Sequence, residues 1–354
     1  MASDHFATVP FAMDRLRRRI ITIPAIFGAA VVLMALAPLW IPVAMVLDVC
    51  QRRWRLPATR LGLFTLCWSW LEAFGVAIAA LLWLAGQRSN QQAHHRLQSW
   101  WAASMMAALQ LTTGIRVSTQ VGSMPPGPAV MLCRHASLAD SLVSAWAITS
   151  VARMRPRYVL KRELLADPCL DVVGHRLPNY FLDRHAADAN AELVALTELA
   201  RGMTSTDVTV IFPEGTRASA SKRQSMLLGI AQRDQRRAQR LQPLIHLLPP
   251  RPGGAAAILA GCPQADVVIA WHSGFDGLDT FGGIIRHLAA PPPPIRFATW
   301  RVPRDQVPHD PAAFADWLDD QWLLADRRVD EAIRADANRQ DPRGADAAPT
   351  DSSR

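Results

Sequence analysis

The chain has 354 residues, of which 50% are hydrophobic, and a formal net charge of +8. This length allows one large catalytic domain plus a membrane region, or two domains at most. The hydrophobic share is high for a soluble enzyme and low for a polytopic transporter, which favours one part in lipid and one part in water. Five cysteines are scattered without a C-x-x-C pair. This argues against a disulfide framework or a zinc site and for a reducing compartment.

The positive charge comes almost wholly from arginine, because Lys161 and Lys222 are the only lysines. An arginine surplus suits anionic lipid, phosphorylated substrates or nucleic acid, but it is equally typical of a GC-rich genome. The sequence contains no recognisable nucleic-acid-binding module, so we expect no nucleic-acid partner.

In chain order, residues 1–19 form a short basic tail, and residues 20–86 are predicted to form two membrane helices or a hairpin. Residues 20–47 contain no charged side chain, and residues 61–86 contain only Glu72. About 20 apolar residues cross the hydrocarbon core, so both runs are long enough. A cleaved signal peptide is disfavoured, because the apolar run continues past the cleavage-like Ala35-Leu36-Ala37 to Leu47.

Arginines bear on the topology of this region. They end the tail and also fill the connector at residues 51–57, and the positive-inside rule places both segments in the cytoplasm. Pro38 and Pro42 could bend the first run into a re-entrant hairpin that satisfies the rule, whereas two ordinary spans would put the connector outside. Either topology returns the chain to the side of the tail by residue 88. We therefore expect a bacterial inner-membrane protein with a cytoplasmic catalytic domain.

Residues 87–113 are predicted to form an amphipathic helix. Trp100 and Trp101 precede Met105 and Met106, which is typical of a helix lying at the membrane interface with its indoles at headgroup depth. An ordinary helix packed on the catalytic domain fits the same pattern.

Residues 114–334 are predicted to form an α/β domain with a mostly parallel central sheet flanked by helices, because short β-rich runs alternate with helical stretches at 138–151 and 187–201. The tail at 335–354 is predicted to be disordered. The predicted strands are Ile115–Val121, Ala129–Cys133, Arg157–Leu160, Asn179–Leu182, Val208–Phe212, Leu244–Leu248, Val267–Trp271 and Ile295–Trp300.

His135 and Asp140 follow a predicted strand and precede a predicted helix, which is where α/β folds place ligands. A neutral imidazole can take the proton of an alcohol, and it works best when its other nitrogen donates to a carboxylate. A packed histidine beside an aspartate that favours the helix dipole explains the same residues. Ser137 could be a nucleophile, but it lacks the G-x-S-x-G elbow and fits an N-cap better.

A second polar segment, residues 212–217, reads Phe-Pro-Glu-Gly-Thr-Arg at another predicted strand end. Gly215 permits a close backbone approach to a ligand. Thr216 offers a hydroxyl and Arg217 a bidentate fork, and both suit phosphate. Glu214 could orient Arg217 or the histidine, or touch the substrate hydroxyl. A tight turn with a structural Glu–Arg pair is the alternative.

Further cations are candidate ligands of phosphate. Arg184 ends another β-rich run, although a surface pair with Asp183 would also explain it. Lys222 and Arg223 begin a basic segment that extends to Arg240, which could contact the phosphates of an acyl donor or anionic lipid. A solvated helix face fits that segment equally well.

Taken together, these segments resemble the glycerolipid acyltransferase family, typified by the 1-acylglycerol-3-phosphate acyltransferases. The resemblance covers roughly residues 115–300. The stretch Leu244–Pro249, with Lys222, is most similar to the branch that contains the lysophosphatidic acid and lysocardiolipin acyltransferases. The four family signatures are matched by Arg134–Asp140, Phe181–Arg184, Phe212–Arg217 and Leu247–Arg251.

The resemblance implies an acyltransferase domain held at the membrane by N-terminal helices. It makes His135 the general base and Asp140 its orienting partner. Family members often have asparagine before the histidine, and Arg134 in this chain could alter the acceptor headgroup. The implied ligands of the acceptor's glycerol phosphate are Arg184, Gly215 and Arg217, with Thr216 and Glu214 beside them.

The sequence therefore predicts a membrane-bound enzyme that moves a fatty acyl group from acyl-CoA or acyl carrier protein to a lysophospholipid, with lysophosphatidate first among the acceptors. Neither a metal nor a further cofactor is expected. Another lysophospholipid or lyso-ornithine lipid is the alternative acceptor, and a lipid ester hydrolase using Ser137 or water is the alternative reaction. A non-enzymatic membrane scaffold fits the site residues poorly. Acyl-chain length, donor type and oligomeric state stay open.

Overall fold

The computed structural model describes residues 8–121, 127–137, 139–183, 188–275, 278 and 280–340. Within them, seven strands form one sheet in the order β1-β7-β6-β2-β5-β3-β4. All neighbouring strands are parallel except β6 and β7, which confirms the predicted α/β fold. The strands are β1 (Val117–Gln120), β2 (Ala129–Cys133), β3 (Arg155–Lys161), β4 (Tyr180–Leu182), β5 (Asp207–Ile211), β6 (Asp266–Ser273) and β7 (Ile295–Val302).

The predicted strand Leu244–Leu248 is wrong. The segment bends at residues 245–247 and belongs to no ladder, because carboxylates accept hydrogen bonds from its backbone amides. Asp326 accepts hydrogen bonds from the amides of residues 245, 246 and 247, at 2.9, 2.7 and 2.7 Å. Glu214 accepts one from the amide of Leu248 at 3.2 Å. These carboxylates replace the strand partner that the β-rich sequence predicted.

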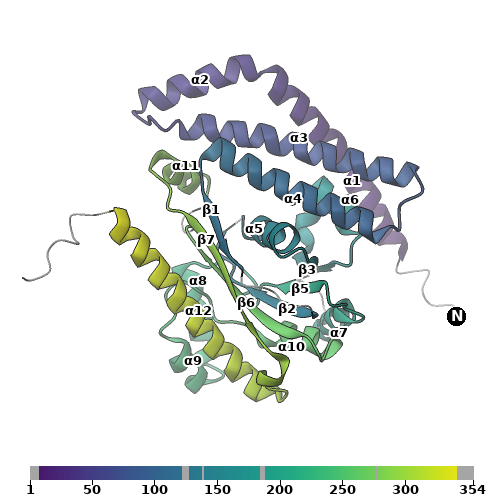
Figure 1. The fold of residues 1–354 in the computed structure, drawn as a ribbon, viewed down its shortest axis with the longest axis vertical. Coiled ribbons are helices and arrows are strands. Elements are labelled where there is room, and N and C mark those ends of the chain that lie inside the picture. Colours follow the sequence, from purple (N-terminus) through teal and green to yellow (C-terminus); the bar gives the residue numbers. More distant parts are fainter. Residues whose placement is uncertain are drawn as a thin grey trace, which may run out of the picture.

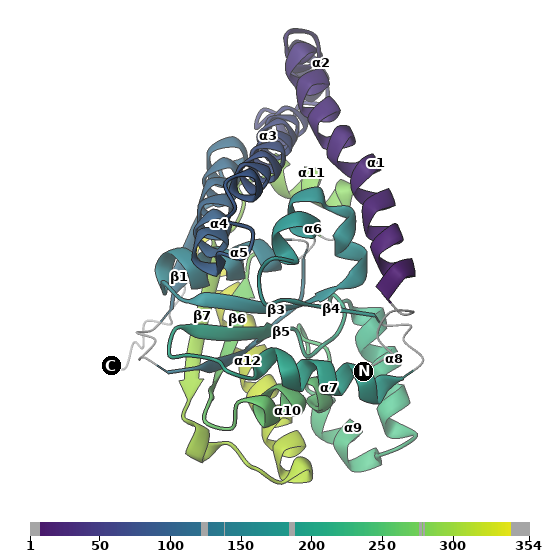
Figure 2. The same cartoon turned by 90° about the vertical axis from the view of Figure 1, so that its right-hand side faces the viewer.

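The central strand β2 contributes to a core on each face of the sheet. Met131 lies in one core and Val130 and Leu132 in the other, as the two-residue period of a strand requires. The first core is covered by α5 (Asp140–Trp146) with a π-helical turn (Ala147–Val151), α6 (Pro168–Gly174) and α11 (Phe281–Ala289). The second is covered by α7 (Ala189–Ala200), α10 (Pro252–Gly261) and α12 (Pro311–Gln340) (Figure 1). Two shorter helices, α8 (Ala220–Ala231) and α9 (Gln235–Leu241), lie at the end of the molecule away from α2 (Figure 2).

The N-terminal region folds as α1 (Thr8–Ala35), α2 (Ala37–Cys50) and α3 (Pro57–Leu84), with a break at Leu36. Residues 8–19, predicted as part of a polar tail, are the first turns of α1. Among the described residues, Asp14–Ala35 and Pro57–Leu84 are long and apolar enough to cross a membrane, and 11% and 33% of their apolar windows are buried. Figure 2 shows α1 and α3 diverging from a tip at α2. These helices suggest membrane association.

Both ends of the α1–α2 excursion are fixed. Arg18 and Arg19 of α1 pair with the fully buried carboxylate of Asp171 on α6, at 2.9 and 3.1 Å. At the other end, Asp48 accepts hydrogen bonds from the amides of Ala58 and Thr59, at 3.2 and 3.0 Å, and so caps α3. Because the contacts of Asp171 bridge segments about 150 residues apart in the sequence, α1 is anchored to the α/β domain at its basic end.

The helix predicted at 87–113 is α4 (Gln91–Thr113), capped by Asn90 and ended by Gly114 in the left-handed conformation. It packs between α3 and the α/β domain (Figure 1). Trp101 points inward and donates a hydrogen bond to Glu72 of α3 at 3.0 Å. The structure therefore favours the domain-packed interpretation over the interfacial one. At the other terminus, α12 continues past Ala335 to Gln340, so the first residues of the predicted disordered tail are helical; residues 341–354 lie outside the described residues.

Candidate active site

The imidazole of His135 lies at the carboxyl end of β2, beside the segment that follows β5. Its Nδ1 is 2.9 Å from Oδ2 of Asp140, and the side chain is 13% exposed. The ring of Phe212 packs against it with a centroid distance of 4.9 Å. The chain turns between the strand and α5, and this turn brings Asp140, the first residue of α5, back to the ring. The structure therefore places Asp140 against the ring of His135, as the sequence predicted.

Asp140 is fully buried and surrounded by donors. Its Oδ2 accepts from His135 and from the amides of Ala136 and Ser137, at 2.9, 2.6 and 2.8 Å. Its Oδ1 accepts from the Ser137 hydroxyl at 2.5 Å and faces Nε2 of His272 at 3.3 Å. Burial alone would raise the pKa of this carboxyl, but the two histidines and the Ser137 hydroxyl outweigh burial and lower the pKa to about 2. Asp140 is therefore ionised at any physiological pH.

An ionised Asp140 fixes the tautomer of His135. A carboxylate only accepts hydrogen bonds, so the Nδ1 of His135 must donate the proton between them. Nε2 then has a free lone pair, and the partly exposed edge of the ring can reach a substrate. This is the arrangement of a general base with an orienting carboxylate.

The hydroxyl of Ser137 takes no part in that arrangement. It is directed at Asp140 and also accepts from the amide of Ala139 at 3.0 Å, and the residue is 1% exposed. Ser137 therefore stabilises the turn, which disfavours its role as a nucleophile.

Glu214 lies behind the histidine and is fully buried. Its Oε1 accepts from the amide of His135 at 3.0 Å and its Oε2 from the amide of Leu248 at 3.2 Å. Burial raises the pKa of Glu214 to about 8, against smaller opposing effects of these amides and of Arg134. The carboxyl thus joins the segments after β2 and β5 to the segment at 244–248, and this geometry fits a brace for His135 better than contact with substrate.

We expect the pH dependence of stability to report on Glu214. A raised pKa means that the folded protein binds the proton more tightly than the unfolded chain. The contribution of Glu214 to the free energy of unfolding is therefore complete below pH 4.5 and is lost as the pH rises through about 8. Glu214→Gln should flatten the fall in thermal stability over this interval, and Glu198→Gln, at an exposed residue, should not. If thermal stability falls equally steeply with pH in wild type and in Glu214→Gln, Glu214 is ionised in the folded protein.

The segment after β5 forms a turn with positively charged side chains against it. Gly215 has a φ of +70°, which glycine adopts without strain. A Cβ at this position would lie 3.7 Å from the guanidinium of Arg251, and the amide of Arg251 donates to the carbonyl of Pro213 at 2.9 Å. Lys222 Nζ lies 3.4 Å from the hydroxyl of Thr216 and 3.3 Å from the carbonyl of Arg217.

This loop is fixed to the general base. The amide of Ala218 donates to the carbonyl of His135 at 2.8 Å. Arg217 is partly buried, and its guanidinium forms neither an ion pair nor a hydrogen bond with the part of the chain that the structure describes. The structure therefore joins the loop that carries Gly215, Thr216 and Arg217 to His135, with Lys222 against the same loop, as a candidate anion-binding site. The candidate Arg184 lies outside the described residues.

Part of the predicted basic segment has a structural role. Arg237 pairs with Asp319 at 2.8 Å, and Arg240 pairs with Asp316 and Asp320, at 2.6 and 3.0 Å. These pairs attach α9 to α12. Arg223, at the start of α8, is partly exposed and stays a candidate contact of the donor or of lipid.

Sequence reasoning missed two residues and misplaced a third. Arg251 ends the fourth signature, yet nothing in the sequence indicated that it would face Gly215. His272 belongs to none of the sequence motifs, and the structure places its Nε2 3.3 Å from Asp140. Arg134 was considered a determinant of the acceptor headgroup, but it is 1% exposed and donates to the carbonyl of His272. It therefore lies beneath the site and cannot contact an acceptor directly.

Comparison with known proteins adds one positive finding. The sequence profile of the family described as Acyltransferase matches residues 114–269, which contain His135, Asp140 and the loop at 212–217. The match supports an acyltransferase activity for this domain. A search of curated proteins finds no match to the chain.

Proposed function

We propose that the protein transfers a fatty acyl group from a thioester donor, acyl-CoA or acyl carrier protein, to the free hydroxyl of a lysophospholipid, with lysophosphatidate as the first acceptor. The main support is the hydrogen bond of 2.8 Å from the amide of Ala218 to the carbonyl of His135. It joins the histidine, whose ring is oriented by Asp140, to the anion-binding loop. A phosphate held by the loop keeps the acceptor within reach of the base.

In the proposed reaction, Nε2 of His135 takes the proton of the acceptor hydroxyl as its oxygen attacks the thioester carbonyl. Asp140 stabilises the imidazolium that forms. The tetrahedral intermediate collapses, the carbon–sulfur bond breaks, and the departing thiolate takes the proton from His135. Because a thiolate is a good leaving group, no acyl-enzyme is required. Arg217 and Arg251 offer guanidinium groups for the acceptor phosphate.

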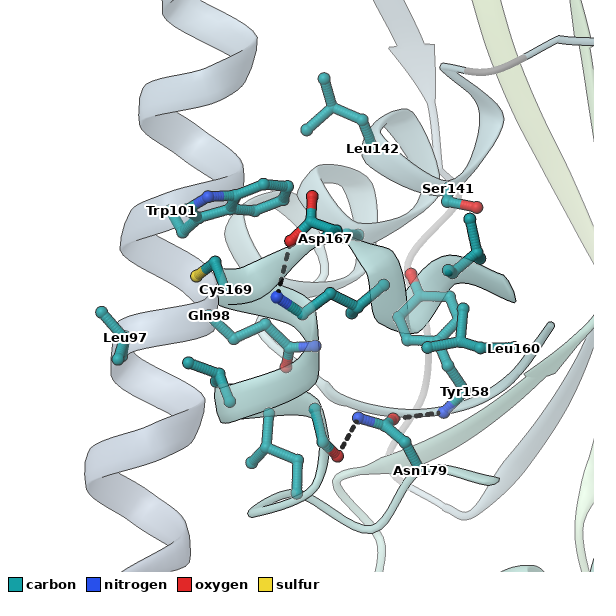
Figure 3. Close-up of a pocket in the computed structure, with 16 residues that line it drawn as sticks. Leu97, Gln98, Trp101, Ser141, Leu142, Tyr158, Leu160, Asp167, Cys169 and Asn179 are labelled. Atoms are coloured by element: carbon teal, nitrogen blue, oxygen red, sulfur yellow. Dashed lines mark hydrogen bonds between the residues drawn. The ribbon is translucent and has the colours of Figure 1, made fainter. Parts of the chain in front are cut away.

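A cavity beneath α5 supports an acyl substrate. Its volume is about 180 Å³, and its walls are mostly apolar (Figure 3). Leu142 and Ala145 of α5 line it, and α5 begins with Asp140. Apolar cavities of about 150 Å³ bind molecules such as benzene, so this one can hold part of an acyl chain close to the reacting groups. Its other lining residues come mainly from α4, β3 and α6.

We expect the size of this cavity to set the preferred chain length. Ala145→Leu adds side-chain volume to the cavity wall and should shift the preference for saturated acyl-CoA donors to shorter chains. Leu164→Ala, at another lining residue, removes volume and should shift it to longer chains. Competition between donors of different length measures both shifts, and unchanged profiles in both variants would place the chain elsewhere.

For the membrane region we propose a re-entrant hairpin. The start of the α1–α2 excursion is fixed on the α/β domain by Arg18 and Arg19 on Asp171. Its end is joined by Asp48 to the start of α3, where Arg60 donates to the carbonyl of Thr113 at the end of α4. This arrangement supports placing the basic tail and the connector at residues 51–57 on the same side of the membrane, as the positive-inside rule requires. It would hold the active site at the surface of the bilayer in which the acceptor resides.

A panel of acceptors tests the proposed function. Purified protein in vesicles receives one acyl-CoA and, in turn, lysophosphatidate, other lysophospholipids and lyso-ornithine lipid. We expect the fastest ester formation with lysophosphatidate. Preference for another lyso-lipid would retain acyl transfer and change the acceptor, whereas release of fatty acid at the same rate without any acceptor would favour a hydrolase.

A further inference from the structure

A second histidine lies at the same sheet edge as the general base. β2 and β6 are parallel neighbours, and Cys133 is paired with Ala270. Because side chains on one face recur every two residues, continuing both strands by two residues brings His135 and His272 to the same edge and face. The topology therefore places two imidazoles next to each other, although 137 residues separate them in the sequence.

The contacts of His272 define its protonation. The side chain is fully buried, and its Nε2 lies 3.2 Å from the carbonyl oxygen of Arg134 and 3.3 Å from Oδ1 of Asp140. Both neighbours are acceptors, so Nε2 must bear a hydrogen. Asp140 thus has one imidazole on each oxygen, His135 at Oδ2 and His272 at Oδ1.

Arg134 holds His272 in this position. Its guanidinium donates to the carbonyl of His272, while its own carbonyl accepts from the His272 ring. Its amide also donates to the carbonyl of Ala270 at 3.0 Å. This reciprocal pair of contacts joins the end of β2 to the end of β6 and leaves the ring of His272 little freedom to turn away from Asp140.

We propose that His272 is a positioning residue, which acts through Asp140 and sets the tautomer of His135 without touching substrate. The inference rests on the proposed function, because it assigns His272 a part in the same proton transfer. A buried carboxylate that loses a neighbouring imidazole N–H tends to turn or to take up a proton. Protonated or turned, Asp140 would no longer fix the Nδ1–H tautomer, and Nε2 of His135 would stop accepting protons.

Three substitutions separate positioning from burial. In His272→Gln the amide nitrogen can occupy the place of Nε2, between the carbonyl of Arg134 and Oδ1 of Asp140. In His272→Asn the side chain is shorter, so its amide nitrogen reaches only the place of Nδ1. Its effects on polarity and burial are similar to those of His272→Gln. His272→Leu removes all donors. We expect kcat to stay within about threefold of wild type for Gln and to fall roughly 10-fold to 100-fold for Asn and Leu, with KM unchanged in all three.

A readout other than activity completes the test. Nitrogen-15 spectra of histidine-labelled protein report the tautomer of His135, and His135→Asn identifies its signals. We expect the Nδ1–H form in wild type and His272→Gln, and its loss in His272→Asn and His272→Leu. The proposal is overturned if the Nδ1–H form persists in the Asn and Leu variants, or if Gln and Asn lose kcat equally. If wild type transfers no acyl group, the proposed function fails, and the tautomer comparison still decides the part of His272.

Discussion

We expect His135→Ala to transfer acyl groups at no more than about a thousandth of the wild-type rate, and to stay folded. The ring is partly exposed and belongs to neither hydrophobic core, so its removal leaves both cores intact. The loss should appear in kcat, because the base acts only as the hydroxyl oxygen attacks the thioester. Thiol release from acyl-CoA in the presence of lysophosphatidate measures it.

Matched variants show whether that loss is chemical. His135→Asn retains an N–H that can point at Asp140 but has no Nε2, so it should be as inactive as the alanine variant and at least as stable. His246→Ala removes another histidine paired with a carboxylate, that of Asp330 at 3.2 Å, and should leave the rate unchanged. Wild-type activity in both His135 variants would remove the histidine from the mechanism.

Asp140→Asn should lower kcat by about 10⁴-fold, the size of effect expected when a buried carboxylate that orients a catalytic histidine becomes an amide. The amide can donate to His135 and so favours the wrong tautomer, with the hydrogen on Nε2. Substrate affinity should change little, because the carboxylate is fully buried and lies behind the ring. Steady-state kinetics with lysophosphatidate as the varied substrate separate kcat from KM.

Asp171→Asn provides the comparison for a buried carboxylate outside the site. It removes the partner of Arg18 and Arg19, so it should destabilise the anchoring of α1 by about 3 kcal/mol. Proteolysis near the N-terminus should become faster while kcat stays within a few-fold of wild type. A loss of kcat as large as that of Asp140→Asn would mean that any buried charge, not the orientation of His135, limits the rate.

The sequence indicated the pairing of His135 with Asp140 because both lie within one strand-to-helix turn, so a local pattern sufficed. It also indicated the loop at 212–217, whose glycine, threonine and arginine are contiguous. The seven remaining predicted strands were found close to their expected bounds for a similar reason, since each is a short run rich in β-forming residues, and the central ones are buried between two helical layers. Local composition was thus enough to predict the strands. The rule that α/β folds place ligands where a strand ends and a helix begins then predicted where the site lies.

What could not be predicted depends on contacts between distant segments. The β-rich segment 244–248 is not a strand, because Asp326 and Glu214 capture its amides, and neither pairing has a local signal. His272 reaches Asp140 only because β6 is the neighbour of β2, a strand order that the sequence leaves open. The same holds for Arg251 beside Gly215. In each case the missing information was the topology, not the residue chemistry.

The central claim is that His135 and the adjoining anion-binding loop move an acyl group from a thioester to a phosphate-bearing acceptor. The most direct measurement follows a labelled acyl chain from acyl-CoA in vesicles that contain wild-type protein and lysophosphatidate. We predict that the label appears in phosphatidate, with one thiol released for each ester formed. Label that accumulates as free fatty acid, with thiol release unaffected by lysophosphatidate, would contradict the account.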